Sequence, residues 1–312
     1  MRALLFPGQG SQSVGMGLEF FKEFKIVKDI FDQADDKLNF KISKMILEGP
    51  EDQLQLTKNT QPAILTVSYS IFTVLKNEFG FKPEDFEFFA GHSLGEYSAL
   101  VCSQSLDFYD ALFLLFERGK AMQSAVPIGK GSMIAVLGLG IEEINELLNS
   151  NKLPGVCEIA NDNAIGQVIL SGEKSKILSI KDKLKENKIK CIPLKVSAPF
   201  HCALMSPAAE TMKEKIFSIN FRRPLNKIVS NVTAKSEQEP TLIKELLVKQ
   251  IFSTVKWRES LSNMHNLGVK QYVEIGPGKA LTGMVKRTLK DINTFSINSI
   301  ADIKNLQHEF KK

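Results

Sequence analysis

Residues 86–100 read FEFFAGHSLGEYSAL, and their pattern is the clearest structural signal in the chain. The apolar run Phe86–Ala90, bounded by Pro83 and Gly91, predicts a buried strand of a parallel sheet. Helically spaced apolar residues follow from Leu94, so a tight turn must connect the strand to a helix. A strand, a turn and a helix in this order predict an α/β fold.

The same alternation of apolar strands and amphipathic helices continues on both sides of this stretch. Further strands are predicted at residues 4–6, 228–230 and 271–275. Helices are predicted at residues 18–34, 60–79, 94–101, 108–126, 242–251 and 257–267, and from residue 281 onward. Thr60 is the expected N-cap of its helix, and Gly80 is expected to close that helix.

The segment from residue 129 to residue 196 has its own order of elements. Strands are predicted at residues 133–137, 156–160, 167–170 and 190–196, and helices at 141–148 and 174–188. The order β-α-β-β-α-β is that of a ferredoxin-like unit, and Pro127 and Pro199 flank it. We therefore expect a discontinuous core, residues 1–127 and 197–312, and an inserted subdomain, residues 128–196.

The composition excludes several classes of protein. The chain has 312 residues, 43% of them hydrophobic and 24% charged, as in a soluble globular protein with a substantial core. No apolar run approaches the roughly 18 residues of a membrane span, and Pro7 ends the first run too early for a signal peptide. The four cysteines form no C-x-x-C pair, so we expect reduced thiols, no metal site and a cytoplasmic location.

Charge is distributed unevenly along the chain. Residues 1–150 contain 13 basic and 20 acidic residues, whereas residues 151–312 contain 27 basic and 15 acidic residues. Residues 173–195 alone hold eight lysines and three acidic residues. A basic region of this kind suits nucleic acid, an anionic membrane, phosphorylated substrates or an acidic protein partner, and composition alone does not choose among them.

The turn Gly91-His92-Ser93-Leu94-Gly95 fits the G-x-S-x-G motif, which places a serine on a sharp bend between a strand and a helix. Ser93 is therefore the predicted nucleophile. The backbone N–H of Leu94, at the start of the helix, is free to bind an oxyanion. The alternative is an ordinary glycine-flanked turn, but the strand before it and the helix after it favour a nucleophile.

A serine nucleophile needs a base, and the chain has four histidines. His92 adjoins Ser93, and neighbours on a strand point to opposite faces, so we expect His92 in a supporting or core position. His265 on an amphipathic helix and His308 in the charged tail are expected at the surface. His201, in a turn after a strand, is the predicted base by elimination, the alternative being a structural histidine.

No aspartate or glutamate stands out as the acid of a triad. A carbonyl oxygen can fix the imidazole tautomer equally well, which would leave a Ser–His dyad.

Gln9 lies in a glycine-rich loop that fits neither the phosphate-binding nor the dinucleotide-binding motif, and its N–H is a candidate second oxyanion donor. Arg118, in a largely apolar helix, suits a carboxylate, the alternatives being a surface position or a pair with Glu117.

Six motifs, in order and at matching spacing, resemble those of the malonyl-CoA:acyl carrier protein transacylases of type II fatty acid synthesis. They are FPGQGSQ at 6–12, TQPA at 60–63, GHSLGEYSAL at 91–100, RGKAMQ at 118–123, PFHCALM at 199–205 and EIGPG at 274–278. The resemblance spans nearly the whole chain and implies a hydrolase-like α/β core with a ferredoxin-like subdomain. Where the family often has N-P-V-x-W, residues 253–257 are STVKW, which is expected to alter only a local loop.

The resemblance also implies roles for individual residues. Ser93 would carry the acyl group and His201 would be its base. The main-chain carbonyl of Gln250, with Asn231 nearby, would orient that base, which accounts for the missing acid.

The oxyanion hole and the carboxylate site also follow from the resemblance. The N–H groups of Gln9 and Leu94 would form the oxyanion hole, and Arg118 would hold the malonyl carboxylate. The reaction implied is ping-pong transfer from malonyl-CoA to the phosphopantetheine thiol of an acyl carrier protein, without cofactor or metal. Carrier proteins are acidic, so the basic second half of the chain is expected to attract carrier protein and CoA rather than nucleic acid or a membrane. We expect a monomer.

Two other functions compete with this interpretation. A serine hydrolase or thioesterase shares the same turn and delivers the acyl group to water, and neither periodicity nor spacing separates it from a transferase. A nucleic-acid-binding protein would suit the basic charge, but the sequence contains no recognisable binding motif for nucleic acid.

Overall fold

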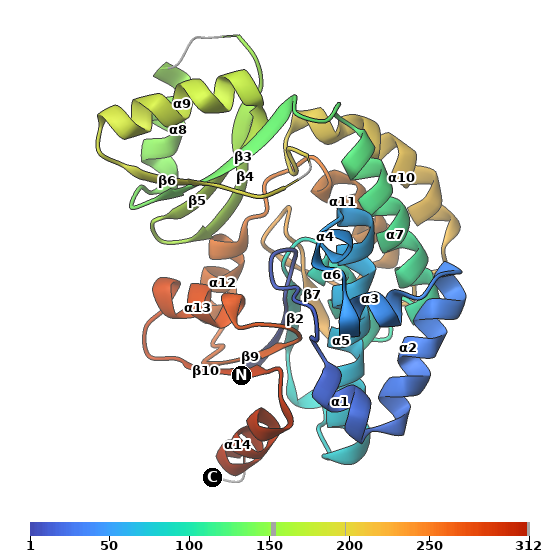
Figure 1. Cartoon of the computed structure of the whole chain (residues 1–312). Helices are drawn as coiled ribbons and strands as arrows, with labels where there is room; N and C mark the ends of the chain where they lie inside the picture. The colour runs from blue at the N-terminus through green and yellow to red at the C-terminus, as the bar shows by residue number, and fades with distance from the viewer. Residues whose placement is uncertain (151–153, 197, 311–312) are drawn as a thin grey trace.

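We describe the chain from a computed structural model, which covers residues 1–150, 154–196 and 198–310 (Figure 1). For residues 307–310 only the backbone is described. Two predictions concern parts of the chain that lie outside this description. The second segment of the core was predicted to begin at Ser197, and the side chain of His308 was predicted to be exposed.

The larger sheet contains, within the described residues, six strands in the order β10-β9-β1-β2-β7-β8. Their bounds are Arg2–Phe6 (β1), Phe88–Gly91 (β2), Lys227–Val229 (β7), Ser236–Glu237 (β8), Gln271–Ile275 (β9) and Asn293–Ile297 (β10). Neighbouring strands are parallel, except that the edge strand β8 runs antiparallel to β7. The predicted parallel sheet is confirmed, and the loops after β1, β2 and β9 meet at its carboxyl edge.

Helices cover both faces of this sheet. Their bounds are Leu18–Glu23 (α1), Lys25–Leu38 (α2), Ile42–Glu48 (α3), Glu51–Leu54 (α4), Thr57–Glu78 (α5), Gly95–Cys102 (α6), Phe108–Ser124 (α7), Ser206–Ser218 (α10), Pro240–Gln250 (α11), Trp257–Asn266 (α12), Ala280–Thr288 (α13) and Ile300–Phe310 (α14). Because side chains alternate along a strand, Leu4 and Phe6 pack with residues of α2, α5 and α7, whereas Ala3 and Leu5 pack with α12 and α13. The core is therefore a three-layer α/β/α structure.

The inserted segment forms a second sheet, drawn in green to yellow in Figure 1. Its strands are Gly131–Leu137 (β3), Cys157–Ala164 (β4), Gln167–Glu173 (β5) and Lys190–Pro193 (β6), and its helices are Ile141–Ser150 (α8) and Lys174–Glu186 (α9). The strands are antiparallel in the order β4-β5-β3-β6, which is the ferredoxin-like arrangement. Ile134 and Val136 face the two helices, and Met133 and Ala135 join the main core. The boundaries of the subdomain, 128–196, stay a prediction.

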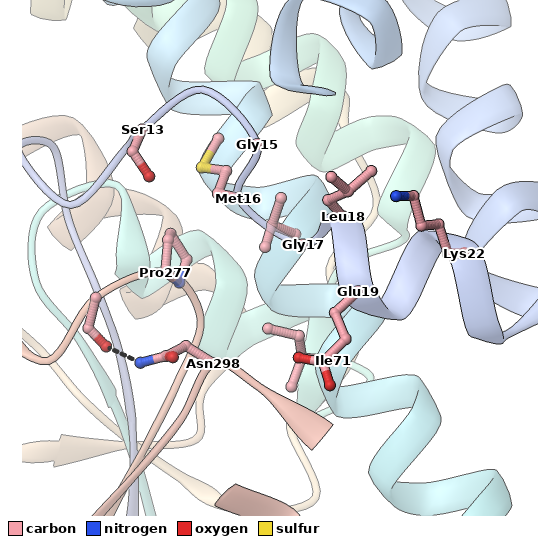
Figure 2. Close-up of a pocket in the computed structure, with 12 residues that line it drawn as sticks. Ser13, Gly15, Met16, Gly17, Leu18, Glu19, Lys22, Ile71, Pro277 and Asn298 are labelled. Atoms are coloured by element: carbon pink, nitrogen blue, oxygen red, sulfur yellow. Dashed lines mark hydrogen bonds between the residues drawn. The ribbon is translucent and has the colours of Figure 1, made fainter. Parts of the chain in front are cut away.

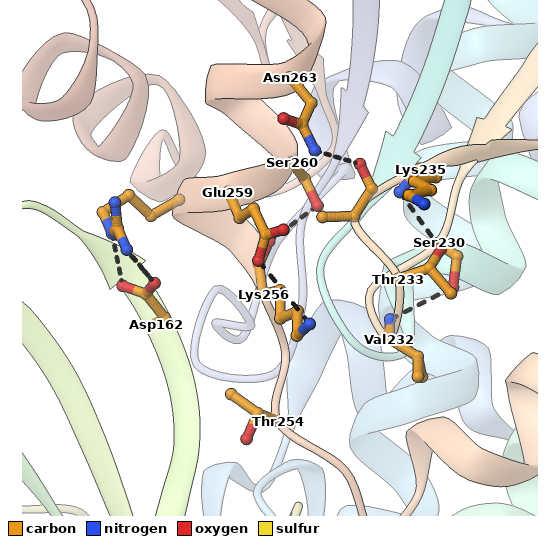
Figure 3. A network of polar contacts seen from close by, with 12 residues as sticks. Asp162, Ser230, Val232, Thr233, Lys235, Thr254, Lys256, Glu259, Ser260 and Asn263 are labelled. Carbon is orange, nitrogen blue, oxygen red and sulfur yellow. Dashed lines mark hydrogen bonds and ion pairs between the residues drawn. The ribbon is translucent and has the colours of Figure 1, made fainter. Parts of the chain in front are cut away.

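Strand β4 joins the small sheet to the core beside the loop that precedes α12. Asp162 N donates to Val255 O at 3.0 Å, and Val255 N donates to Ala160 O at 2.8 Å. The Asp162 carboxylate also accepts Arg258 Nε at 2.9 and 3.0 Å and lies 2.9 Å from Arg258 Nη2 (Figure 3). Because Asp162 is almost fully buried, this bidentate pair and the backbone bonds hold the small sheet in one position over the core.

Three details differ from the elements predicted above. The helix expected at 18–34 is divided into α1 and α2, because Phe24 has an extended backbone and packs its ring against Phe20 and Phe79. Thr60 is not an N-cap: α5 begins at Thr57, and the Thr60 hydroxyl donates to Leu54 O instead of accepting a backbone N–H. The sequence prediction also omitted α3, α4, α10, α14, β8 and β10.

Candidate active site

The G-x-S-x-G turn lies where β2 ends and α6 begins. Ser93 has a left-handed backbone, with φ of 52°, which places its hydroxyl at the tip of the bend. A Cβ on Gly91 would lie 1.9 Å from the carbonyl of Gly95, and a Cβ on Gly95 would lie 2.3 Å from Phe6 O. Only glycine at both positions therefore allows the turn to close on itself and to lie against the end of β1.

Ser93 and His201 form a hydrogen-bonded pair although 108 residues separate them. Ser93 Oγ lies 2.8 Å from His201 Nε2, and His201 Nδ1 lies 2.8 Å from the main-chain oxygen of Gln250. Because a carbonyl oxygen only accepts, Nδ1 carries the proton and Nε2 is left to accept the proton of the serine. A serine on a neutral imidazole is an arrangement that can generate a nucleophile.

The surroundings of His201 keep its ring uncharged. Burial, and then the positive charge of Arg118, lower the pKa of His201 to about 3. The bond to Gln250 O opposes this shift but does not cancel it. At neutral pH the imidazole is therefore in the form that accepts a proton.

Two backbone N–H groups are available for an oxyanion. Gln9 follows β1, Leu94 follows Ser93, and both line a cavity of about 100 Å³ together with Ser93 and His201. Among the described residues, neither N–H has a hydrogen-bond acceptor. The structure thus brings the two predicted donors to the predicted nucleophile.

Arg118 reaches the same cavity from α7 and is 1% exposed. Its Nη2 donates to Ser93 Oγ at 3.1 Å and to Gln250 Oε1 at 2.8 Å, and its Nη1 donates to Gln61 Oε1 at 2.8 Å. Its Nε has no partner within the described part of the chain. The alternative pair with Glu117 is not formed, since that carboxylate bonds to two lysines. A guanidinium held this way can bind a carboxylate beside the serine.

Asn231 differs from the expectation that it orients the base. Its Oδ1 accepts the N–H of Ser93 at 2.7 Å, and its Nδ2 donates to Gly91 O at 2.8 Å. The two ring nitrogens of His201 are occupied by Ser93 and Gln250, so the Asn231 amide holds the strained turn rather than the imidazole. The Gln250 carbonyl lies where the resemblance placed it.

Several residues around the site were not singled out from the sequence. Gln61 contacts Arg118, Asn161 lines the cavity, and Asn163 Oδ1 lies 2.8 Å from His92 Nε2. Glu96 is buried and accepts two hydrogen bonds from neighbours of the site. The sequence signal for Glu96 was its place directly after the motif, whereas the asparagines lie on a strand whose pairing with the core could not be seen in the sequence.

His92 and His265 make no hydrogen bond to the Ser93–His201 pair. The His92 ring lies 5.5 Å from the ring of Trp257 in an edge arrangement, and its Nε2 bonds to Asn163. His265 is half-buried on α12, where its Nε2 lies 3.4 Å from Lys270 Nζ. Neither contacts the Ser93 hydroxyl.

A larger cavity, of about 580 Å³, lies between the loops that follow β1 and β9 (Figure 2). Its lining includes Met16, Glu19 and Asn298, but the Asn298 amide donates to Gly278 O, and Glu19 accepts the N–H of Ile300. It contains none of the predicted site residues. In the described residues no group of three His, Cys, Asp or Glu side chains could hold a metal ion, and no helix there is long and apolar enough to cross a membrane.

Comparison with known proteins agrees with this geometry. Residues 3–311 match the family model of the acyl transferase domain. The malonyl CoA-acyl carrier protein transacylase of Haemophilus influenzae is 42% identical over 310 residues, which are 99% of this chain and 98% of that protein. The acyl-carrier-protein S-malonyltransferase of Bartonella henselae has a crystal structure that matches with a TM-score of 0.96 at 39% identity, over 100% of this chain and 99% of that one.

A further solved structure is a type II PKS acyl-carrier protein in complex with its malonyl-transacylase. It matches with a TM-score of 0.95 at 38% identity and covers 99% of each chain. Sequence and structure are thus similar to these proteins from one end of the chain to the other. The chain belongs to the acyl transferase domain family, in the group of the malonyl CoA-acyl carrier protein transacylases.

Proposed function

We propose that this chain transfers the malonyl group of malonyl-CoA to the phosphopantetheine thiol of an acyl carrier protein, through a malonyl ester of Ser93. The product supplies malonyl groups for fatty acid synthesis. The observation that carries this proposal is the buried Arg118 guanidinium, 3.1 Å from Ser93 Oγ, because it offers a carboxylate-binding group next to the nucleophile.

The first half-reaction loads the enzyme. Ser93 Oγ attacks the thioester carbon while His201 Nε2 takes the hydroxyl proton. The negative charge that develops on the carbonyl oxygen is stabilised by the N–H groups of Gln9 and Leu94. When the C–S bond breaks, His201 returns the proton to the sulfur, and CoA leaves as the free thiol.

The second half-reaction reverses these steps with a different thiol. The phosphopantetheine thiol of the carrier protein gives its proton to His201 and attacks the malonyl ester. The same two N–H groups bind the oxyanion, and Ser93 leaves with the proton that His201 returns. In each half, neutral His201, held by Gln250 O, acts as base, and the imidazolium that it becomes then acts as acid.

Arg118 selects the acyl group. A malonyl group ends in a carboxylate that can accept hydrogen bonds from the guanidinium, whereas an acetyl group has no such acceptor and leaves the buried charge without a new partner. A serine hydrolase is the competing function. The small cavity and the apolar side chains of Met122, Met133 and Phe200 around the serine support transfer, since they limit the room for water.

We also propose that the chain acts as a cytoplasmic monomer that engages neither nucleic acid nor membranes. For the partners, the supporting feature is the basic charge of α9 and β6, which suits an acidic carrier protein and the phosphates of CoA. Within the relatives, a carrier protein complex has been solved for one malonyl-transacylase.

Intact-protein mass measurement tests the main proposal. Incubation with malonyl-CoA should add one malonyl group, and subsequent addition of phosphopantetheinylated carrier protein should remove it and place it on the carrier. Release of the group as free malonate at the same rate with and without carrier protein would instead assign a hydrolase.

A further inference from the structure

Glu96 is a buried titratable group that the reaction described above does not use. It follows Gly95 at the start of α6 and is 2% exposed. Its Oε2 accepts Gln250 Nε2 at 2.8 Å and the backbone N–H of Asn231 at 3.1 Å. A buried carboxyl group is costly unless it has partners, so its position beside the site calls for a role.

One neutral amide connects this carboxyl group to Arg118. Gln250 Oε1 accepts a hydrogen bond from Arg118 Nη2. Gln250 Nε2 donates to the Glu96 carboxyl group and to the main-chain oxygen of Ser93. The orientation of the amide is determined, because Arg118 only donates and the main-chain oxygen of Ser93 only accepts. Glu96 and Arg118 thus lie at the two ends of one hydrogen-bonded chain.

No carboxylate among the described residues is in ion-pair contact with Arg118, although this guanidinium is buried. A carboxylate in direct contact would occupy the donors that a substrate carboxylate needs. A carboxylate placed one residue further away still compensates the buried positive charge, while Arg118 Nε keeps no partner within the described part of the chain. We propose that Glu96 is a positioning residue that acts as the resident counter-ion of Arg118, linked to it through the Gln250 amide.

This inference rests on the proposed function, because it concerns what happens when a malonyl carboxylate enters. The substrate then brings a second negative charge to one guanidinium, and an ionised Glu96 opposes its binding. Burial raises the pKa of Glu96 to about 7, so its charge changes within the working range of pH. The charged and titratable groups that act on it are Arg118 from α7 and Tyr97 from its own helix, and burial raises the pKa of Tyr97 to about 12.

The test is the ratio of kcat/KM for malonyl-CoA to kcat/KM for acetyl-CoA between pH 6 and pH 8.5. Both substrates carry the same CoA, so titration of its phosphates and of the Ser93–His201 pair cancels in the ratio. In the wild-type enzyme we expect the ratio to fall on the order of tenfold as pH rises through about 7 and Glu96 ionises. In Glu96→Gln, which keeps an acceptor oxygen for Gln250 and Asn231 but no charge, we expect a ratio independent of pH.

Each outcome of this measurement either supports or overturns the proposed role of Glu96. A wild-type ratio that does not change with pH, or the same fall in Glu96→Gln as in the wild type, overturns the counter-ion role. Glu96→Leu is a second charge-free variant should Glu96→Gln not fold, and Glu96→Asp, which keeps a carboxylate, should retain the fall. Absence of any malonyl-enzyme in the wild type would overturn the proposed function itself, whereas malonylation with a constant ratio overturns only the role of Glu96.

Discussion

Ser93 Oγ and His201 Nε2 lie 2.8 Å apart, and both residues hold a left-handed backbone, with φ of 52° and 57°. For a residue other than glycine this conformation costs on the order of 1 kcal/mol or more. The Asn231 amide fixes the Ser93 turn and the Gln250 carbonyl fixes the His201 ring, so the surrounding hydrogen bonds maintain both strained residues. The pair is therefore preorganised before substrate binds.

Replacing Ser93 by alanine should abolish the acyl-enzyme, because Ser93 is the one described residue whose hydroxyl is hydrogen-bonded to His201. We expect no mass increase after incubation of Ser93→Ala with malonyl-CoA, and a loss of transfer to carrier protein to the background rate. An unchanged melting temperature would show that the variant is folded. A malonyl label on Ser93→Ala would refute the assignment of the nucleophile.

Replacing Arg118 by alanine should remove the preference for a carboxylate. Hydrogen bonds between charged groups contribute about 1.5–3 kcal/mol, so kcat/KM for malonyl-CoA should fall at least tenfold, while acetyl transfer is spared or rises. Lysine at this position keeps the charge but not the two parallel donors, and should restore only part of the malonyl activity. Equal losses with both acyl groups would indicate damage to the Ser93–His201 pair instead of a carboxylate site.

The elements and residues that depend on local pattern could be predicted from the sequence. The parallel strand before Gly91, the helix after it and the ferredoxin-like order follow from periodicity and glycine positions, and Ser93 follows from its turn. His201 was found only by eliminating three other histidines. The division at Phe24 could not be predicted, because one extended residue inside a helical pattern is set by the aromatic rings that pack around it.

Residues whose role depends on long-range contacts were predicted incompletely. Asn231 was expected beside the base, yet its amide lies on the Ser93 turn. Asn163 gave no signal of its own, because a short polar side chain reveals its partner only when the strand that carries it is placed, and Glu96 was marked only by its place directly after the motif. The bidentate pair between Asp162 and Arg258 likewise joins residues 96 positions apart.

The stability of the protein should depend on pH through His201. Its pKa is about 3 in the folded protein and near 6.5 when unfolded, so between these values the unfolded chain binds more protons and stability is lost as pH falls. Compared with His201→Ala, the wild type should lose about 1.4 kcal/mol per pH unit below about 6.5. Urea unfolding of both proteins between pH 8 and pH 5 measures this difference, which should be constant above pH 7. A constant difference down to pH 5 would contradict a buried neutral imidazole.

Charge reversal on α9 should affect the carrier protein more than CoA. Lys174 and Lys185 are exposed on this helix, and neither is in an ion pair with a described residue. We expect Lys174→Glu/Lys185→Glu to raise KM for carrier protein several-fold at low salt, with a smaller change for malonyl-CoA. Lys28→Glu, at an exposed position of α2 in the acidic half of the chain, is the control. Equal effects on both substrates would argue against a docking surface on α9.

The glycine at position 95 should be indispensable to the fold of the site. A Cβ there would lie 2.3 Å from Phe6 O and 2.8 Å from Pro7 O, which are backbone atoms that cannot move without displacing β1 or the loop that carries Gln9. Gly95→Ala should therefore lower the free energy of unfolding by about 3 kcal/mol and also slow acylation, because Leu94 N–H and Gln9 N–H are driven apart.

A second glycine supplies the control for this argument. Gly283 is exposed within α13, and a Cβ there meets no atom within 4 Å, so Gly283→Ala should raise stability by about 0.5–1 kcal/mol through helix propensity. Thermal unfolding should thus show a lower stability for Gly95→Ala and a higher stability for Gly283→Ala. Single-turnover acylation should be altered only in Gly95→Ala. Wild-type acylation by Gly95→Ala would mean that the turn tolerates displacement from β1, and the close approach would then not be what holds the oxyanion donors in place.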